Sequence, residues 1–265
     1  MTHSRLAAPT PTPHSPAGSA IARYARAEPG FEARLATTQA LLRQAADSGR
    51  AVQASSLGAE DMVLTDLINR LRLPIGIFVL DTGLLHPQTL ALLQRLREQQ
   101  AAHPHAPLTI YRPQQEAVDA FVEREGDEAM RRSVALRKAC CALRKLEPLE
   151  RALHGQAAWV TGLRREQSEA RSEVPPIDTS ERARHGRLKF NPLADWSWGD
   201  VWHYIQRHGV AYNPLHDQHM PSIGCAPCTR AITAGEPFRA GRWWWEDDAA
   251  KECGLHVKPP IGEHP

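Results

Sequence analysis

Apolar residues recur along this chain in two patterns, helical spacing and short continuous runs. Within residues 31–45, apolar side chains recur at intervals of three, four and seven, which places them on one face of a helix. Residues 76–80 are instead a continuous apolar run, too short for a helix and typical of a strand buried on both faces. On the same criteria we predict strands at 51–54, 76–80, 108–111 and 158–162, and helices at 31–46, 59–71, 87–99, 135–146 and 198–209.

The order of these elements predicts the fold class. Strands that alternate with helices of this length are typical of an α/β fold with an open, mainly parallel, twisted sheet and flanking helices. In such sheets, ligands bind at the carboxyl ends of the strands. Loops 55–58, 81–83 and 162–167 directly follow predicted strands, so we expect the functional site to lie among them.

Composition limits the classes of partner. Hydrophobic residues make up 42% of the 265 positions, enough for a sizeable core, and 32 basic against 30 acidic side chains leave a net charge of +2. This balance argues against a nucleic-acid coat protein or a polybasic membrane binder. The apolar run at 75–80 is also far shorter than the roughly 20 residues of a membrane helix. We therefore predict no nucleic-acid partner and no membrane partner.

The two ends of the chain differ in character from the middle. Residues 1–25 contain four prolines among small and polar residues, and we predict a disordered leader there. This stretch shows no signal peptide, so we expect a cytoplasmic protein. We assign residues 26–235 to one α/β domain and residues 236–265 to a mobile C-terminal segment.

The five cysteines are unevenly placed along the chain. Cys140 and Cys141 are adjacent, Cys225 and Cys228 form a C-x-x-C pair, and Cys253 stands alone near the C-terminus. An odd number of cysteines without an export signal argues against a disulfide framework. The pattern favours metal or redox chemistry instead.

Both cysteine pairs are spaced like metal ligands. In the predicted helix at 135–146, Arg144 lies four residues after Cys140, and Lys145 lies four residues after Cys141. Each thiol therefore shares a helix face with a cation that favours its thiolate form. Four thiolates suit either zinc or an iron–sulfur cluster. Adjacent cysteines are awkward ligands for one tetrahedral ion and easier ligands for a cluster of separate iron atoms, so the spacing favours the cluster.

Cys253 is a candidate nucleophile. It lies in residues 251–256, where Lys251 and His256 would lower the thiol pKa and Glu252 would raise it. A thiol in a basic neighbourhood on a mobile segment suits a group that reacts and is then presented to a partner. An inert terminal thiol is the alternative.

Hydroxyls, backbone amides and arginines near the strand ends are candidates for anion binding. A strand-to-helix loop can hold a sulfate or phosphate on its N–H groups, although such a loop can also simply cap its helix. Arginine forks match tetrahedral oxyanions, although solvated surface arginines give the same pattern. The candidates are Ser55, Ser56 and Gly58 in the loop after the first strand, Arg164 after the fourth, and Arg239 and Arg242 near the C-terminus.

Together these stretches resemble the assimilatory sulfonucleotide reductases, the family of adenylyl-sulfate (APS) and phosphoadenylyl-sulfate (PAPS) reductases. The resemblance covers roughly residues 50–258. The tandem cysteines, the C-x-x-C pair and the terminal Glu-Cys-Gly-Leu-His are highly specific in combination. The matching segments are 55–61, 80–83, 140–145, 161–168, 225–228, 239–245 and 251–256.

The resemblance implies a fold, a cofactor and an activity. The fold would be similar to that of the adenine nucleotide alpha hydrolases, with a C-terminal redox segment. The four paired cysteines would bind one 4Fe–4S cluster per subunit, which marks the branch that uses APS. APS would be reduced to sulfite and AMP with electrons from thioredoxin or glutaredoxin, in sulfate assimilation and cysteine biosynthesis. A homotetramer is expected on the same grounds.

The resemblance also implies roles for single residues. Cys253 would attack the sulfur of APS, AMP would leave, and the resulting S-sulfocysteine would release sulfite when a thioredoxin thiol attacks it. His256 would help to activate the Cys253 thiolate. The other implied roles are charge neutralisation by Arg239 and Arg242, nucleotide contacts by Arg164 and Asp81, and a position between cluster and sulfate for Lys145.

Three alternatives stay open at this point. The first is a PAPS reductase or an enzyme that accepts both nucleotides. The second is an ATP-dependent thiolation enzyme on the same sheet, although residues 55–61 do not reproduce the Ser-Gly-Gly-x-Asp-Ser loop usual in that class. The third is a four-cysteine zinc module that binds RNA or a protein. The balance of basic and acidic residues argues against RNA as its partner.

Overall fold

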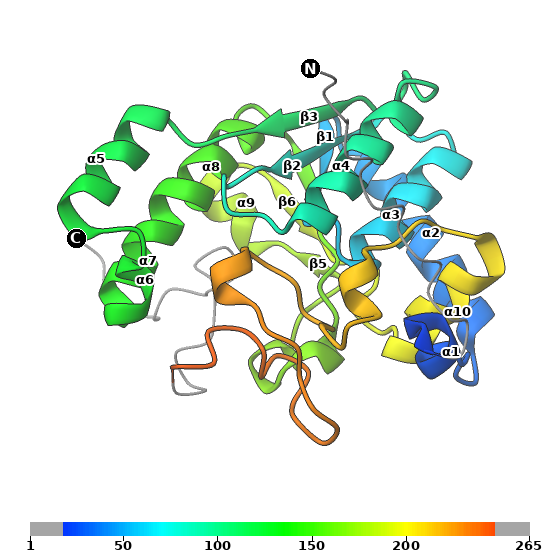
Figure 1. The fold of residues 1–265 in the computed structure, drawn as a ribbon. Helices are drawn as coiled ribbons and strands as arrows, with labels where there is room; N and C mark the ends of the chain where they lie inside the picture. The colour runs from blue at the N-terminus through cyan, green and yellow to red at the C-terminus, as the bar shows by residue number, and fades with distance from the viewer. Residues whose placement is uncertain (1–17, 247–265) are drawn as a thin grey trace, which may run out of the picture.

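Six short strands form one sheet at the centre of the molecule. The computed structural model describes residues 18–246, except the side chains of residues 181, 183 and 184 (Figure 1). The strand order is β3-β2-β1-β4-β6-β5, and every neighbouring pair is parallel except β5 with β6. The predicted open, mainly parallel α/β sheet is therefore confirmed. The strands are β1 (Ala51–Ser55), β2 (Ile75–Leu80), β3 (Leu108–Tyr111), β4 (Ala158–Val160), β5 (Ile177–Asp178) and β6 (Leu188–Phe190).

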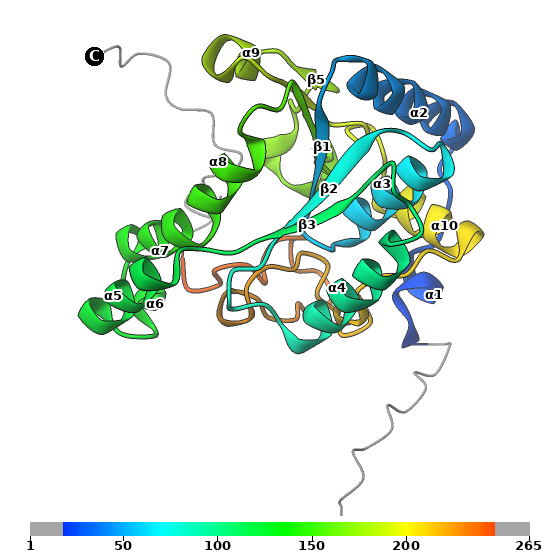
Figure 2. The same cartoon turned by 90° about the horizontal axis from the view of Figure 1, so that it is seen from above.

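The main hydrophobic core lies on one face of this sheet. Helices α2 (Phe31–Asp47), α3 (Ala59–Arg70) and α10 (Trp198–His208) pack their apolar sides against inward-facing residues of the strands. Helix α4 (Pro87–Gln100) extends the same layer over Val79 of β2. Figure 2 shows these four helices together on one side of the sheet. This layer holds the strand ends in a fixed relation to one another.

A second, smaller layer covers the opposite face. Phe78 and Trp159 point to that side and pack against Leu149 and Leu153 of helix α8 (Glu147–Leu153). Helix α8 continues a helical stretch that begins with α7 (Val134–Cys141). Because side chains alternate along a strand, Phe78 faces this layer while its neighbours Ile77 and Val79 face the main core.

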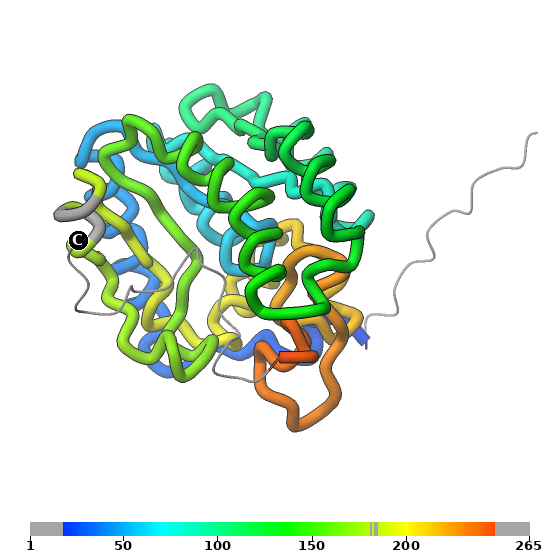
Figure 3. The backbone as a smooth tube through the Cα atoms, turned by 90° about the vertical axis from the view of Figure 1, so that its left-hand side faces the viewer, coloured from blue at the N-terminus to red at the C-terminus, as the bar shows by residue number. Residues whose placement is uncertain are grey.

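A third apolar cluster joins segments that are far apart in the sequence. Helices α5 (Gln115–Glu125), α6 (Ala129–Arg132) and α7 lie beside the segment that follows α10, as Figure 3 shows for the green and orange parts of the chain. The buried members of this cluster are Phe121, Ala129, Met130, Cys140, Cys225, Cys228 and Trp243. Three of the four paired cysteines are therefore buried in one place.

Several boundaries differ from those predicted from the sequence. Residues Ala20–Tyr24 form helix α1, capped by the Ser19 side chain, so ordered structure starts inside the stretch predicted as a disordered leader. The helix predicted at 135–146 is α-helical only to Cys141 and continues as the π-helix Ala142–Leu146. Helix α9 (Ser180–His185) was not predicted. No helix within residues 18–246 has both the length and the apolar character needed to cross a membrane.

Candidate functional site

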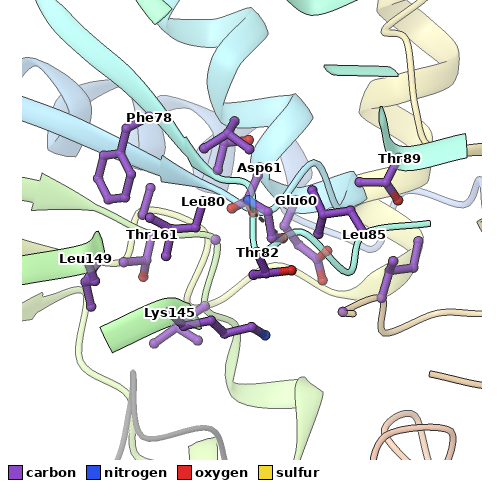
Figure 4. Close-up of a pocket in the computed structure, with 18 of the residues that line it drawn as sticks. Glu60, Asp61, Phe78, Leu80, Thr82, Leu85, Thr89, Lys145, Leu149 and Thr161 are labelled. Carbon is purple, nitrogen blue, oxygen red and sulfur yellow. Dashed lines mark hydrogen bonds between the residues drawn. The ribbon is translucent and has the colours of Figure 1, made fainter. Parts of the chain in front are cut away.

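A cavity of about 200 Å³ opens where β1, β2 and β4 end, and we call it the strand-end cavity. Figure 4 shows Asp61 and Lys145 on opposite sides of it. Aromatic and aliphatic side chains form one part of its wall, and hydroxyls, two carboxylates and two cations form the rest. The lining residues that matter below are Ser55, Ser56, Glu60, Asp61, Phe78, Thr82, Lys145, Trp159, Gly162, Gln167, Arg171 and Cys225.

Two of the three predicted anion-binding residues of the first loop line this cavity. Ser55 and Ser56 are in its wall, and Gly58 is the cap residue of α3 outside the lining. The backbone N–H of Ser56 and its hydroxyl both donate to Oδ2 of Asp61, each at 2.7 Å. The N–H of Gly58 donates to Oγ of Ser56 at 3.4 Å. These donors are already used inside the protein.

The first amide of helix α3 is also satisfied from within the chain. The N–H of Ala59 donates to Nε2 of His216 at 3.2 Å, and the N–H of Leu57 donates to Oγ of Ser55 at 3.3 Å. Burial lowers the pKa of His216 to about 4, so the imidazole is neutral and its Nε2 can accept. In this structure the loop caps its helix, and substrate binding by Ser55, Ser56 and Gly58 stays a prediction.

Two buried carboxylates face the strand-end cavity. Desolvation raises the pKa of Asp61 to about 6, against the opposing effect of the hydrogen bonds from Ser56. Gly162 leaves room for this carboxylate, because a Cβ there would lie 2.5 Å from Oδ1 of Asp61. Oε1 of Glu60 accepts from Arg164 and from Gln167, each at 3.0 Å. The cavity wall is thus acidic at this end.

Arg164 lies outside the cavity lining. Its side chain is fully buried, its Nε donates to Glu60, and its Nη1 donates to Glu166 at 2.6 Å. The guanidinium also stacks over Trp198. The structure thus places Arg164 in a buried ion-pair network, and its predicted contact with a nucleotide phosphate stays a prediction.

Asp81 also lies just outside the lining. Its Oδ1 accepts from the N–H of Gly83 at 3.1 Å, and its Oδ2 accepts from Arg112 at 2.9 Å. Its neighbour Thr82 does line the cavity. Asp81 therefore shapes the turn that presents Thr82, and its own predicted contact with the nucleotide stays a prediction.

All four paired cysteines line a second cavity, which we call the cysteine cavity. Cys140 and Cys141 come from the end of α7, and Cys225 and Cys228 from a short 3₁₀ turn. Oγ of Thr82 lies 3.3 Å from Sγ of Cys225. The sequence prediction that the two pairs meet is therefore matched by their position. Lys145 and Cys225 also line the strand-end cavity, so the two cavities share a wall.

Four cations surround these thiols, and none of the described lining residues is a carboxylate. The cations are Arg137, Arg144, Lys145 and Arg242. Burial raises the pKa of Cys140, and Arg144 beside it acts in the opposite direction. Burial likewise raises the pKa of Cys228 to about 11, opposed by Arg242 and Lys145. Arg137 is ion-paired with Glu246, and the other three cations place positive charge beside the thiols, which suits an anionic occupant.

The π-helix changes the directions in which Arg144 and Lys145 project from the helix. Residues Ala142–Leu146 follow directly on the tandem cysteines, and the wider turn shifts Arg144 and Lys145 relative to an α-helix. Arg144 donates to the carbonyl of Thr82 at 2.8 Å and also contacts Cys140. Short π segments are frequent at functional sites. Helical spacing alone could not reveal this one.

The two arginines near the C-terminus differ in position. Arg242 is buried, donates from Nε to the carbonyl of Cys228 at 3.2 Å and lines the cysteine cavity. Its guanidinium lies over Gly224, where a Cβ would come within 2.2 Å of it. Arg239 is half-buried and lines neither cavity. Cys253 and His256 lie outside the described residues.

Sequence reasoning missed several residues of the strand-end cavity. Arg171 lines it and donates to Oε1 of Gln167 at 2.7 Å. Phe78 and Trp159 supply flat apolar surface in its wall. Both aromatic residues lie in predicted strands, and their side was not predictable without knowing which face α8 covers.

The described residues contain no ready-made metal site. Within residues 18–246, no group of three or more His, Cys, Asp or Glu side chains is arranged to hold a metal ion. The four thiols nevertheless line one cavity.

Comparison with proteins of known sequence identifies close relatives. Adenosine 5′-phosphosulfate reductase from Allochromatium vinosum is 56% identical over 205 residues, which is 77% of this chain and 78% of that protein. The reductase of the same name from Burkholderia cepacia is 50% identical over 230 residues, 86% of this chain and 90% of that protein.

A solved structure and a family model agree with these two relatives. Phosphoadenylyl-sulfate (PAPS) reductase from Candida auris superposes with a TM-score of 0.60 at 30% identity, covering 74% of this chain and 90% of that one. The phosphoadenosine phosphosulfate reductase domain matches residues 50–231, which include both cavities except the end of the cysteine cavity at Arg242 and Trp243. The chain therefore belongs to the phosphoadenosine phosphosulfate reductase family.

Proposed function

We propose that this protein reduces adenosine 5′-phosphosulfate to sulfite and AMP. The observation that carries the proposal is the shared wall: a cavity at the strand ends adjoins a four-thiol, four-cation cavity through Lys145 and Cys225. The relatives named adenosine 5′-phosphosulfate reductase, at 50% and 56% identity, support the same substrate. Sulfate assimilation and cysteine biosynthesis are the processes that such a reaction serves.

The chemistry needs a thiolate, positive charge and a dithiol. The Cys253 thiolate attacks the sulfur of APS, the sulfur–oxygen bond to the phosphate breaks, and AMP leaves with the bonding pair. The enzyme then carries cysteine S-sulfonate. A thiol of a reduced thioredoxin or glutaredoxin attacks Sγ of Cys253, sulfite leaves, and the partner's second thiol regenerates the cysteine while the partner forms a disulfide.

Cations make the first step feasible. The sulfonate oxygens repel a thiolate, so positive groups at the sulfur end of the substrate lower the barrier. Lys145 lies in the walls of both cavities and Arg242 lies in the cysteine cavity. We assign charge neutralisation to these two residues. Arg239, which is half-buried, keeps that role as a prediction.

The residues of the cysteine cavity fit a 4Fe–4S cluster, one per subunit. Cys140, Cys141, Cys225 and Cys228 would hold it, and the surrounding cations would balance its negative charge. When bound, the cluster supplies fixed negative charge and ties α7 to the C-x-x-C turn. The spacing supports a cluster over a single zinc ion, because the adjacent Cys140 and Cys141 are awkward ligands for one tetrahedral ion.

The acidic end of the strand-end cavity favours APS over PAPS. Glu60 and Asp61 line that end. Because Glu60 is ion-paired with Arg164, Asp61 is the carboxylate that would accept a hydrogen bond from a sugar hydroxyl and repel a phosphate. Dinucleotide sites use the same distinction, in which an acidic residue selects a free ribose hydroxyl and an arginine accommodates a phosphate. Steady-state kcat/KM values with both nucleotides test this, and comparable values would overturn it.

The test of the proposed function uses Cys253→Ser and sulfate-labelled APS without reductant. Wild type is expected to gain one SO₃ group at Cys253, and the variant is expected to gain none and to produce no sulfite when thioredoxin is added. Sulfite production by the variant at the wild-type rate would overturn the proposal. ATP turnover without APS would instead favour a thiolation enzyme. The homotetramer and the cytoplasmic location stay predictions.

A further inference from the structure

Helix α1 fastens a turn that comes from a distant part of the sequence. Nη2 of Arg23, on α1, donates to the carbonyl of His216 at 2.8 Å and to the carbonyl of Asp217 at 3.0 Å. The N–H of Ala20, the first residue of α1, donates to Oδ1 of Asp217 at 2.7 Å. Figure 1 shows α1 beside α10. Arg23 thus holds two successive carbonyls at the end of a helical turn, where carbonyls lack partners within the turn itself.

The turn held in this way comprises residues 213–217, and we call it the support turn. Its centre is the 3₁₀ helix Pro214–His216, which Asn213 caps by accepting from the N–H of Leu215 at 3.1 Å. Asn213 is 0% exposed and His216 is 2% exposed. The support turn is therefore packed inside the protein.

The support turn contacts two elements that line the strand-end cavity. Nδ2 of Asn213 donates to Oγ1 of Thr89 at 2.8 Å, and Thr89 lines the cavity from α4 (Figure 4). Nε2 of His216 accepts from the N–H of Ala59 at 3.2 Å. Ala59 is the first residue of α3, and the next two residues of that helix line the cavity. The turn therefore joins α3 to α4, which contribute separate parts of the cavity wall.

Aromatic packing joins α1 to the same turn by a second set of contacts. The ring of Tyr24 packs against Trp198 and Trp202 of α10, with ring centroids 5.9 Å and 6.3 Å apart. Both tryptophan rings also pack against the imidazole of His216, at 5.7 Å and 5.3 Å. The ring of His216 is thus fixed by aromatic packing and its carbonyl by α1, so the residue has little freedom to move relative to α3.

Two buried hydrogen bonds depend on the exact place of the support turn. A shift of about 1 Å would take the Asn213–Thr89 and His216–Ala59 contacts out of hydrogen-bonding range. A buried donor or acceptor that loses its partner is costly, so Thr89 and the start of α3 would move to recover one. Displacement of the turn would therefore be passed on to the cavity wall.

We infer that Arg23 is a positioning residue for the strand-end cavity, which acts on Thr89 and on the start of α3 through the support turn. The inference rests on the proposed function in one respect, the binding of the nucleotide in this cavity. Arg23 lines neither cavity, so it acts only through the residues that it holds. It raises the affinity for the nucleotide by keeping two parts of the wall in place.

The same segment of the chain offers a matched control. Arg26 comes three residues after Arg23 and is exposed. Arg26→Gln removes the same charge as Arg23→Gln at nearly the same place, but it leaves both carbonyls of the support turn with their donor. Arg23→Lys is a second test variant, because an ammonium group keeps the charge but lacks the planar fork of a guanidinium.

The experiment measures the dissociation constant of AMP by calorimetry, with full-length, iron-loaded protein well below the unfolding temperature of every variant. For Arg23→Gln we expect AMP to bind more weakly by on the order of tenfold. KM for APS should rise by a similar factor, with kcat and iron content unchanged, because the lost interaction serves binding and not the chemical step. Arg26→Gln should match wild type, and Arg23→Lys should lie between wild type and Arg23→Gln.

A double-mutant cycle tests the route through the support turn. Thr89→Val removes the acceptor of Asn213, and we expect it to weaken AMP binding. Because Arg23 acts through the same contact, the loss in Arg23→Gln/Thr89→Val should be smaller than the product of the two single losses. Losses that multiply would show that the two residues act independently.

Each result decides the inference. AMP binding at the wild-type affinity in Arg23→Gln overturns it, even if thermal stability falls, because Arg23 would then only stabilise the fold. An equal loss in Arg26→Gln overturns it, as do losses that multiply in the cycle. If Arg23→Gln does not fold, Arg23→Lys decides, and wild-type affinity in that variant overturns the inference. If wild type itself binds no AMP, the proposed function fails at its nucleotide site, and this outcome is separate from all of the others.

Discussion

The two adjoining cavities are built on opposite principles. In the strand-end cavity, polar groups satisfy one another: Ser56 donates to Asp61, and Arg164 and Gln167 donate to Glu60. In the cysteine cavity, four cations and four thiols face each other without a carboxylate among the described lining residues. Some of these cations also have partners within the protein, since Arg137 is paired with Glu246 and Arg144 and Arg242 donate to backbone carbonyls, but the thiols themselves face positive charge.

The backbone around the two cavities differs in the same way. The first cavity stands on a regular sheet with helices on both faces, which gives it a fixed shape. The second is assembled from a helix end, a π-helix and a 3₁₀ turn. Irregular backbone can bring donor atoms from separate segments to one place. The stability of such an arrangement then depends on the ligand that the donor atoms bind.

Removal of one thiol should have the largest effect, and it should disturb the cysteine cavity while leaving the strand-end cavity intact. Cys228→Ser is expected to lose most of its iron and to lower kcat/KM for APS by at least a thousandfold, more than a single hydrogen-bond donor contributes to a transition state (about 10²–10³). The strand-end cavity should survive, because Cys228 is not in its lining. Iron analysis, visible absorbance and AMP binding measure these effects. Full activity without iron would contradict the expectation.

Lys145→Met tests the wall that the cavities share. The substitution removes one cation and keeps most of the side-chain volume, so we expect iron to be retained and kcat/KM to fall by about a hundredfold. Lys138→Met on the exposed side of α7 is the matched control and should leave both unchanged. An effect confined to KM would place Lys145 in ground-state binding alone.

Gly162→Ala should disturb the strand-end cavity and spare the cysteines. The new Cβ would lie 2.5 Å from Oδ1 of Asp61 and 2.9 Å from Cβ of Glu60, and overpacking of this kind costs about 1–3 kcal/mol. We expect lower thermal stability and a higher KM, with unchanged iron content. Gly76→Ala, whose Cβ would be 3.5 Å from its nearest neighbour, should behave like wild type. Equal destabilisation by both would refute the crowding argument.

His216→Gln should have the smallest effect on activity, and its effect on stability should depend on pH. The folded pKa of His216 is lowered from 6.5 to about 4, so His216 costs stability as pH falls below 6.5. Asp61 acts in the opposite sense, because its pKa is raised from 3.8 to about 6 and protonation then favours the folded state. In wild type the two contributions largely cancel.

Substitution of His216 uncovers the Asp61 contribution. When the pH is lowered from 6.5 to 5, the free energy of unfolding of His216→Gln should rise by about 2 kcal/mol relative to that of wild type. Denaturant unfolding of both proteins at these two pH values measures it, and activity at pH 7.5 should be unchanged. A difference that stays constant with pH would show that His216 does not titrate as its burial implies.

The sequence predicted those parts of the fold that have a long periodic signal. The four predicted strands and helices such as α2, α4 and α10 lie within a few residues of their predicted bounds. Strands β5 and β6 have only two and three residues and contain Asp178 and Lys189, so they lack the continuous apolar run of the equally short β4. The π-helix was read as α-helix because a single wider turn leaves the apolar spacing almost unchanged.

The candidate site was predictable where the chemistry is local. The cysteine pairs carry their spacing in the sequence, and the structure brings them to one cavity. Arg164 shows the limit: its partner Glu60 is 104 residues away, so nothing nearby in the sequence indicated a buried structural ion pair. The partners Arg137 and Glu246, 109 residues apart, were hidden for the same reason.

The wall made by Lys145 and Cys225 couples the two cavities without any movement of the backbone. Because both residues line both cavities, a change of charge in one cavity alters the electrostatic potential in the other, and the protein interior weakens this effect less than water would. Occupancy of either cavity is therefore expected to change the affinity of the other, and by the same factor in both directions.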